Sequence, residues 1–376
     1  MDFALSSDQE MIRDTAEGFL AEASSSAAVR AAMETEFGFE PRLWAQIAQE
    51  LGWCATPIPE AYDGLGLGSV ELVLLMEQMG RRLLCSPFFA TVGLAAQVLM
   101  EAGSDAAKQR YLPAIAAGEL TATVALASQG MDWQPEAVDA TVTAENVFNG
   151  RFQFVADGAS ADLLILPARD ASGAIAFYAL SATLSGITRT PLKNFDRTRR
   201  LASLTLENVQ LPADAQIATP QQVAASMPRA LARARLALAA EQLGCAQQCL
   251  DLTVAYTSER VQFGRTIASF QAIKHRCAEM MVKIEATRSA IYGAAAVAGN
   301  PALAADFLCE AAAAKALASD TCCHCAADAI QLHGGVGFTW EYDPQLYFKR
   351  AQASAHWLGS SDVLREHIAT VLLDAA

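Results

Sequence analysis

The hydrophobic pattern changes twice along this chain of 376 residues, and the two changes constrain the fold. Up to about residue 118, apolar side chains recur at helical spacing, as in residues 71–79. From Thr121 to about Leu211, short runs of valine, isoleucine, phenylalanine and threonine alternate with Asn-Gly, Asp-Gly and Ser-Gly turns, which indicates β-strands. Helical spacing returns after Pro220. The sequence therefore predicts an α+β chain with an N-terminal α domain (1–118), a middle β domain (119–218) and a C-terminal helical domain (219–376).

Composition excludes several classes of protein. The formal charge of −14 argues against a nucleic-acid partner, because affinity for phosphate depends on lysine and arginine. Hydrophobic residues make up 53% of the chain and charged residues 18%, which is enough for a sizeable core. No apolar span of membrane-crossing length appears, and no basic segment precedes an apolar stretch at the N-terminus. We therefore expect a cytoplasmic enzyme with no membrane segment.

The nine cysteines do not predict a disulfide framework or a metal site. Residues 322–325 read Cys-Cys-His-Cys, which invites a metal interpretation. Neighbouring residues on a helix point about 100° apart, however, so adjacent cysteines do not converge on one ion as Cys-x-x-Cys pairs do. The alanine-rich surroundings from 311 to 330 favour a buried helix in which thiols pack as small hydrophobic groups. We predict no metal.

Two separated segments carry the strongest functional signal. Residues 260–271 begin with Arg260, a charged fork suited to pyrophosphate oxygens, and include Phe263 as an apolar wall. About seventy residues later, Gln331 offers an amide donor and acceptor. Gly334 and Gly335 have no Cβ, so their backbone N–H groups can approach a phosphate closely. Taken separately, these residues also fit a helix end and a tight turn.

Together, the two segments resemble the cofactor-donating edge of the acyl-CoA dehydrogenase family. Further matches follow the family's order along nearly the whole chain: residues 3–9, the glycine-rich loop 58–68, the helix 76–80, and the approach to the β domain at 111–119. The resemblance implies two α domains flanking a β domain, with the last helices forming a four-helix bundle that also dimerises. It further implies an acyl-CoA substrate, an electron-transfer flavoprotein as acceptor, and FAD. Arg260, Phe263, Gln331, Gly334 and Gly335 would then serve the FAD of a neighbouring subunit.

The chain departs from the family in its own flavin cradle. Members carry a Thr-Glu-Pro-x-x-Gly-Ser-Asp segment at the start of the β domain, whereas residues 125–133 contain no such motif. The next cradle element is usually Trp-Ile-Thr-Asn-Gly, and residues 154–158 read Phe-Val-Ala-Asp-Gly. Phe154 keeps an aromatic wall, but Ala156 offers no hydroxyl. The chain thus resembles a donor of one half of a flavin site that poorly forms the other half.

The catalytic base is altered as well. The family places its carboxylate either in a C-terminal Tyr-Glu-Gly-Thr segment, where this chain has Leu358, or on a helix before the arginine motif, where it has Ala234. Neither side chain accepts a proton. Glu241 lies seven residues past Ala234, hence on nearly the same helix face, and burial would raise its pKa toward that of a base. The alternative is a polar contact with the flavin, a partner chain or a buried arginine such as Arg235.

Three other features have simpler interpretations. His333 falls inside the glycine segment, where packing of the turn is the expected role. His356 adjoins the altered base segment and would titrate near neutrality, but nothing in the sequence orients it. The basic stretch 189–200 would suit coenzyme A phosphates or a partner subunit, and ordinary surface charge on a turn explains it equally well.

These departures resemble one branch of the family: bacterial heterotetramers of two unlike subunits, associated with steroid and other bulky acyl groups, in which one chain has a degraded site and completes its partner's. The leading hypothesis is that this chain is such a subunit. One alternative is a self-sufficient homo-oligomer that uses Glu241 as its base. Another is a binding or assembly protein that kept the fold and lost the chemistry.

Overall fold

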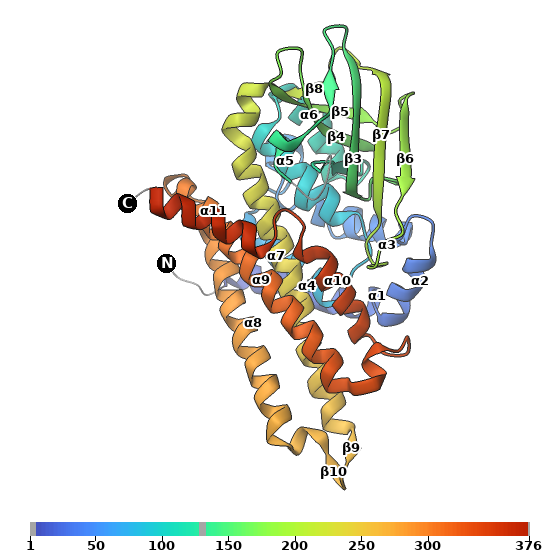
Figure 1. The fold of residues 1–376 in the computed structure, drawn as a ribbon, viewed down its shortest axis with the longest axis vertical. Helices are drawn as coiled ribbons and strands as arrows, with labels where there is room; N and C mark the ends of the chain where they lie inside the picture. Colours follow the sequence, from blue (N-terminus) through green and yellow to red (C-terminus); the bar gives the residue numbers. More distant parts are fainter. Residues whose placement is uncertain (1–4, 128–132, 375–376) are drawn as a thin grey trace. The chain divides into compact units, whose positions relative to one another are not determined.

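The computed structural model describes residues 5–127 and 133–374, and its elements follow the predicted order of helix, sheet and helix (Figure 1). The α+β class is therefore confirmed. The chain packs into two compact units built from non-consecutive segments. The helical unit comprises Met1–Ala31, Ser69–Leu84 and Arg235–Ala376, and the sheet unit comprises Ala32–Gly68 and Cys85–Ala234. The division into three consecutive domains stays a prediction.

The sheet unit contains an eight-stranded sheet within the described residues. Seven strands follow the order β6-β7-β3-β2-β4-β5-β8, and β1 pairs parallel to β4. Their bounds are β1 (Ala122–Val124), β2 (Thr141–Val142), β3 (Val147–Ala156), β4 (Leu163–Arg169), β5 (Ile175–Ser181), β6 (Ile187–Pro191), β7 (Leu201–Gln210) and β8 (Gln216–Ala218). Phe148 and Phe152 on β3 are buried four residues apart, and the Phe148 ring meets the Tyr178 ring edge-on at 5.8 Å. Such aromatic pairs fix the core of the sheet.

Helices of the sheet unit precede or surround the strands. They are α3 (Pro41–Ala45), the π-helices η1 (Gln46–Glu50) and η4 (Phe89–Ala95), α5 (Ala96–Ala102), α6 (Asp105–Ala116), and the 3₁₀ turns η2 (Trp53–Ala55), η3 (Glu60–Tyr62) and η5 (Pro135–Ala137). The indole N–H of Trp44 donates to the carbonyl of Gly118 at 3.2 Å, which links α3 to the turn after α6.

The helical unit holds most of the C-terminal chain. Its elements are α1 (Ser7–Ala23), α4 (Ser69–Arg81), the hairpin β9 (Val261–Gln262) and β10 (Arg265–Thr266), η6 (Ile267–Ser269), α8 (Gln271–Ala298), η7 (Pro301–Leu303), α9 (Ala304–His333), η8 (Gly334–Phe338), α10 (Pro344–Ala355) and α11 (Ser361–Asp374). Two helices, α2 (Ser26–Glu34) and α7 (Pro220–Glu259), extend from one unit into the other. In Figure 1, α8 and α9 run side by side, and the Thr287 and Thr321 hydroxyls hydrogen bond between them at 2.8 Å. No helix in the described part of the chain combines the length and apolar character needed to cross a membrane.

Two glycines let α4 and α7 cross with their backbones in contact. A Cβ built on Gly80 would lie 2.0 Å from the carbonyl oxygen of Glu241, and one built on Gly244 would lie 1.8 Å from that of Glu77. The Cys245 thiol donates to the Gly80 carbonyl at 3.3 Å across the same contact. Only residues without a Cβ permit this approach.

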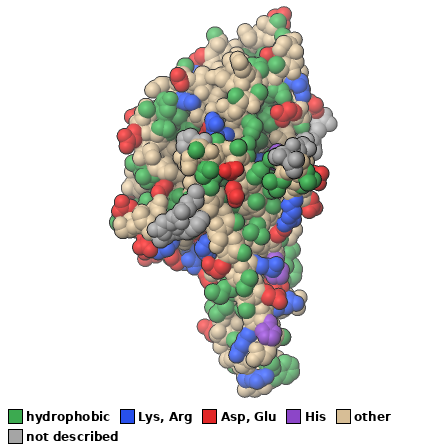
Figure 2. Space-filling view, turned by 90° about the vertical axis from the view of Figure 1, so that its left-hand side faces the viewer, with side chains coloured by type: hydrophobic (Ala, Val, Ile, Leu, Met, Phe, Trp, Pro, Cys, Tyr) green, Lys and Arg blue, Asp and Glu red, His purple; other side chains and the backbone are tan. Residues whose placement is uncertain are grey.

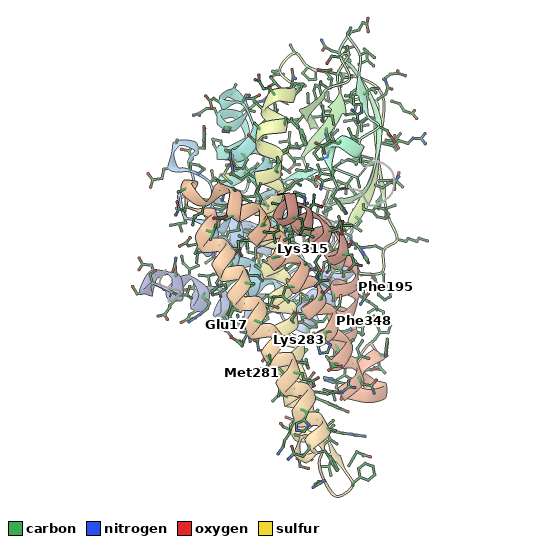
Figure 3. The ribbon with its side chains drawn as sticks, turned by 60° about the vertical axis from the view of Figure 1, so that its left-hand side comes forward. Glu17, Phe195, Met281, Lys283, Lys315 and Phe348 are labelled. Carbon is green, nitrogen blue, oxygen red and sulfur yellow. The ribbon has the colours of Figure 1, made fainter. Side chains whose placement is uncertain are left out.

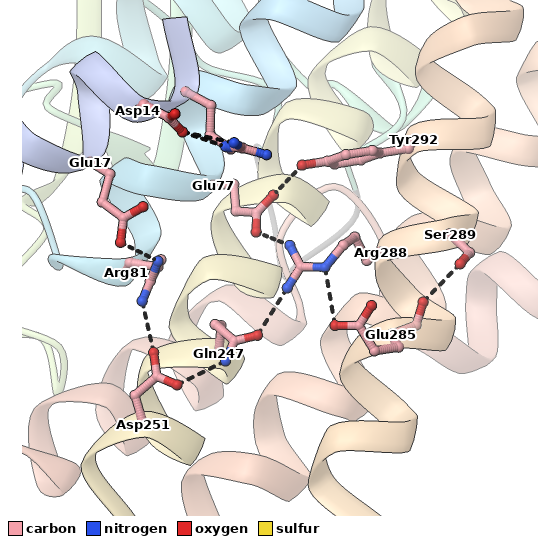
Figure 4. A network of polar contacts seen from close by, with 11 residues as sticks. Asp14, Glu17, Glu77, Arg81, Gln247, Asp251, Glu285, Arg288, Ser289 and Tyr292 are labelled. Atoms are coloured by element: carbon pink, nitrogen blue, oxygen red, sulfur yellow. Dashed lines mark hydrogen bonds and ion pairs between the residues drawn. The ribbon is translucent and has the colours of Figure 1, made fainter. Parts of the chain in front are cut away.

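A polar network ties α7 to α1, α4 and α8 beside that crossing (Figure 4). The Glu77 carboxylate accepts from the guanidinium of Arg288 and, at 2.8 Å, from the Tyr292 hydroxyl. Arg81 bridges the carboxylates of Glu17 at 2.9 Å and Asp251 at 2.8 Å. Hydrogen bonds to charged groups are the stronger kind, so this network fixes the positions of the four helices.

Candidate functional site

The first motif segment forms an exposed hairpin directly after α7. Arg265 pairs with Gln262 and Thr266 with Val261, and the two central residues, Phe263 and Gly264, have φ of 53° and 76°. Two consecutive positive φ values are typical of a tight hairpin turn. The Phe263 side chain is 90% exposed at its tip. The Phe263 ring meets the Phe270 ring edge-on at 6.1 Å and otherwise lies open to another molecule.

Arg260 lies at the base of the hairpin. Its N–H donates to the carbonyl of Tyr256 at 2.9 Å, and its carbonyl accepts from Ile267 N–H at 2.8 Å, so both ends of the turn close on it. Its side chain is exposed and makes no hydrogen bond or ion pair with any described residue. The backbone of Arg260 is thus fixed while its guanidinium stays available for an anion.

The second motif segment is the end of α9. Gly334 caps the helix with φ 65° and ψ −143°, a conformation that only glycine adopts readily. A Cβ built on Gly334 or Gly335 would meet nothing within 4 Å, and both residues are exposed, as is Gln331. The Gly334 N–H donates to the carbonyls of Ile330 and Gln331, so the part of this turn that lies open to another molecule is its exposed surface without side chains.

His333 joins the two segments. Its ring stacks on Tyr256 at 4.4 Å between centroids, and Tyr342 meets both rings edge-on. His333 Nδ1 lies 2.7 Å from the carbonyl of Ala329, so that nitrogen carries the proton. Burial lowers the pKa of His333. The imidazole therefore packs the end of α9 against the end of α7, in agreement with the expected turn-packing role.

Exposed aromatic and basic side chains surround this flavin edge, which we define as Arg260, Phe263, Gln331, Gly334 and Gly335. Trp340, which follows η8, is 54% exposed, and the Lys349 ammonium lies 4.4 Å from the centre of its ring. The guanidinium of Arg265 lies 4.0 Å over the ring of Phe270. Figure 2 shows basic and histidine side chains along the lower part of the molecule in that view. Lys274 and His275 of α8 are exposed. A local positive surface thus exists on a chain of net charge −14.

The residues of the flavin cradle in the sheet unit are engaged internally. Phe154 has φ 55° near the end of β3, and the carbonyl of Ala156 accepts from the Thr123 hydroxyl at 2.6 Å. Residues 128–132, which fall where the family's Thr-Glu-Pro motif begins, lie outside the described residues. The described cradle positions offer a carbonyl already in use and, at residue 156, an alanine side chain without a hydroxyl.

Both family positions of the base are buried and apolar. Ala234 is fully buried on α7, and Leu358 is 1% exposed in the turn between α10 and α11, where it has φ 58°. The Leu358 carbonyl accepts from Arg235 Nε at 2.8 Å. The turn is therefore well fixed but carries no proton acceptor at these two positions.

Glu241 forms an ion pair across the helical unit. Its carboxylate oxygen Oε1 accepts from Nη1 of Arg350 on α10, and the two side chains are 3% and 2% exposed. Glu241 therefore contacts a buried arginine, which was one of the alternatives considered for it. The arginine is Arg350 on α10 and not Arg235. Arg350 was missed in the sequence because nothing local marks a charged residue of α10 as the partner of α7.

The remaining candidates are structural. Cys322 and Cys325 are buried, and a hydrogen bond with Cys245 together with burial raises the pKa of Cys322. No group of three or more potential ligands in the described chain fits a metal ion. In the basic stretch, Arg200 donates to the carbonyls of Met33 and Thr35, so that arginine anchors a loop of the sheet unit.

Two family models match the sequence of this chain. Residues 6–119 match the model of the acyl-CoA dehydrogenase N-terminal domain, and residues 224–373 match that of the C-terminal domain. The chain belongs to the acyl-CoA dehydrogenase family. Members are FAD-dependent oxidoreductases, which confirms the expected enzyme class and cofactor.

Three similar proteins are informative. Acyl-CoA dehydrogenase IpdE2 of Mycolicibacterium smegmatis is 34% identical over 94% of this chain and 96% of its own length. The ChsE4-ChsE5 complex of Mycobacterium tuberculosis contains a chain with a TM-score of 0.88 and 25% identity, covering 99% of both chains. A variant of the Tcur3481-Tcur3483 steroid acyl-CoA dehydrogenase contains one with a TM-score of 0.85 and 25% identity, covering 98% of both.

Proposed function

We propose that this chain is the site-completing subunit of a heteromeric acyl-CoA dehydrogenase. In this proposal a base-bearing partner subunit holds most of the FAD and carries the catalytic carboxylate. This chain contributes the flavin edge: the Arg260 fork toward the pyrophosphate, the Phe263 ring as an apolar wall, Gln331 toward the adenine end, and the open backbone of Gly334 and Gly335. The resemblance of the chain to members of two-chain complexes supports the assignment.

The single observation that carries the proposal is the contrast between the two halves of the site. The flavin edge is exposed and preorganised, whereas Leu358 and Ala234 stand buried at the base positions and Glu241 is bound to Arg350. A general base must reach the α-proton of the acyl thioester, and an ion-paired carboxylate inside a helix bundle is poorly suited to that. FAD, when bound, supplies the acceptor for the hydride that leaves the β-carbon.

The substrate and the electron acceptor belong to the same proposal. We infer a steroid or other bulky acyl-CoA substrate from the likeness to the Tcur3481-Tcur3483 steroid enzyme. The acceptor expected for this family is electron-transfer flavoprotein. Reduction of that protein by the assembled enzyme, compared between a steroid side-chain acyl-CoA and butyryl-CoA, tests both inferences, and equal or faster turnover of butyryl-CoA would contradict the bulky substrate.

Co-expression tests the division of the site. The chain purified alone should be colourless, because an incomplete cradle lacks several hydrogen bonds worth about 1 kcal/mol each. Co-purification with a base-bearing acyl-CoA dehydrogenase chain should give a yellow complex. Stoichiometric FAD on the isolated chain would contradict the proposal.

Glu241→Gln distinguishes this proposal from a self-sufficient enzyme. Glutamine keeps the size and hydrogen-bonding reach of the side chain but accepts no proton. If the partner supplies the base, the rate of flavin reduction per bound flavin should stay within a few-fold of the parent. Loss of about 10²- to 10⁴-fold with flavin content retained would identify Glu241 as the base. Glu279→Gln, an exposed change on α8, is the matched control.

A further inference from the structure

Two buried cations converge on the end of α10 and the turn that follows it. Arg235 on α7 donates through Nε to the carbonyl of Leu358 at 2.8 Å. Lys315 of α9, labelled in Figure 3, is fully buried, and its ammonium donates to the Ser319 hydroxyl at 2.7 Å. The same ammonium lies 3.4 Å from the carbonyls of Ser354 and Ala355. Both cations thus contact backbone carbonyls within residues 354–358.

No carboxylate of the described chain forms an ion pair with either cation, and Asp320, whose charge acts on Lys315, is paired with Arg365. Neither Arg235 nor Lys315 forms an ion pair with a described residue, and the nearby Glu241 is bound to Arg350. Burial lowers the pKa of Arg235 to about 10. Burial and then the charge of Arg235 lower the pKa of Lys315 to about 7. A guanidinium taken out of water beside a second basic group favours the approach of an anion.

The guanidinium of Arg235 has a face left for that anion. Its terminal nitrogens Nη1 and Nη2 form no hydrogen bond with any residue that the structure describes. Neither nitrogen is among the fully buried side-chain atoms of the described chain that lack a partner. Both are therefore partly accessible and contribute to the 7% exposure of Arg235. The hydrogen bond of Nε holds the guanidinium in one orientation. Its two terminal nitrogens then present coplanar N–H donors that can bind the two oxygens of a carboxylate.

The residue whose carbonyl accepts from Arg235 Nε is also the position at which a negative charge would be expected. Leu358 occupies the position at which related enzymes are expected to carry a glutamate, and it is apolar and 1% exposed. Arg235 is present in this chain, but position 358 carries leucine in place of the expected glutamate. A ligand that brings its own carboxylate would restore the charge balance and hydrogen bond the free nitrogens.

We propose that the Nη face of Arg235 is a binding site for the carboxylate of a small organic acid. The one printed hydrogen bond of the Arg235 side chain is to Leu358 of the helical unit, and the site uses no residue of the flavin edge and does not depend on the proposed partner subunit. Binding requires that the ligand be ionised and that it approach Arg235 with its two oxygens in the plane of the guanidinium.

Calorimetric titration of the purified full-length chain tests this site with butyrate as the probe. Butyramide, which has the same shape without the charge, and inorganic phosphate, a tetrahedral anion, serve as comparisons. We expect butyrate to bind at least tenfold more tightly than either comparison. Equal binding of butyrate and butyramide, or no butyrate binding at tens of millimolar, would overturn the proposal, and phosphate binding as tightly as butyrate would contradict the assigned carboxylate.

Two variants assign the site to Arg235. Arg235→Gln should weaken butyrate binding at least tenfold, whereas Arg365→Gln, the same change at an exposed arginine of α11, should leave it unchanged. Leu358→Glu places a carboxylate beside the guanidinium and should block butyrate without removing the arginine. This second variant keeps the test decisive if Arg235→Gln does not fold. Undiminished butyrate binding by Leu358→Glu would show that the anion binds elsewhere.

Discussion

The crossing of α4 and α7 gives the most direct stability prediction. In Gly244→Ala, the new methyl group would lie 1.8 Å from the Glu77 carbonyl oxygen and 2.7 Å from the Arg81 nitrogen. Both atoms belong to backbone, so the helices must separate rather than a side chain rotate. Overpacking of this kind typically costs about 1–3 kcal/mol, and the gain of about 0.5–1 kcal/mol from replacing a helical glycine offsets only part of it.

The expected change in melting temperature follows from that range. For a unit of roughly 150–250 residues, 1 kcal/mol corresponds to about 2–4 °C. Differential scanning calorimetry should therefore show Gly244→Ala melting several degrees below the parent. Gly18→Ala on α1 is the matched control, because a Cβ there meets nothing within 4 Å and the helix gains propensity, so its melting temperature should be unchanged or higher. A Gly244→Ala protein that melts at or above the parent would refute the reasoning.

Three further predictions test the charged residues. Arg260→Ala should weaken FAD retention in the assembled enzyme by about 2 kcal/mol or more, seen as flavin lost on dialysis; a complex that keeps its flavin like the parent would contradict the role of this fork. Arg350→Met should destabilise the chain by about 3–5 kcal/mol in denaturant unfolding, and adding Glu241→Gln should recover part of that loss, whereas additive losses would mean that the ion pair is not the relevant contact. The pKa of Lys315 is lowered from 10.5 to about 7, so between these values the unfolded chain holds a proton that the folded chain has released, and stability should rise with pH. The melting temperature of the parent relative to Lys315→Met should accordingly increase from pH 7 toward pH 9, and parallel profiles would count against a buried, titrating lysine.

The order of elements and the places of the two motif segments at helix ends could be predicted because their signals are local, whereas the flavin-binding role of those segments stays a prediction. Strand-rich segments between turn residues predicted the sheet, and the positions of Arg260 and Gly334 marked the ends of two long helices. The contact that unites those ends was not predictable. Tyr256 and His333 are ordinary residues of their own helices, and only the packing of α7 beside α9 stacks their rings.

The contact made by Glu241 could not be predicted from the sequence. Helical spacing correctly placed it on a buried face of α7, but spacing along one helix carries no information about Arg350, which lies on α10 more than a hundred residues away. Whether a buried charged residue is stabilised depends on such partners, which are distant in the sequence. Arg235 was expected to be buried, but its hydrogen bond to the Leu358 carbonyl and the burial of Lys315 could not be predicted, because both depend on residues far away in the sequence.

The tryptophan beside the flavin edge gives the molecule a built-in optical reporter. Trp340 is 54% exposed, whereas Trp44, Trp53, Trp133 and Trp357 are at most 8% exposed. Emission from water-exposed indole, quenchable by iodide, should therefore come almost entirely from one side chain. Covering of this surface by a second chain or by a nucleotide would shift that emission to shorter wavelength and protect it from the quencher. The encounter can thus be followed in real time without attaching a label.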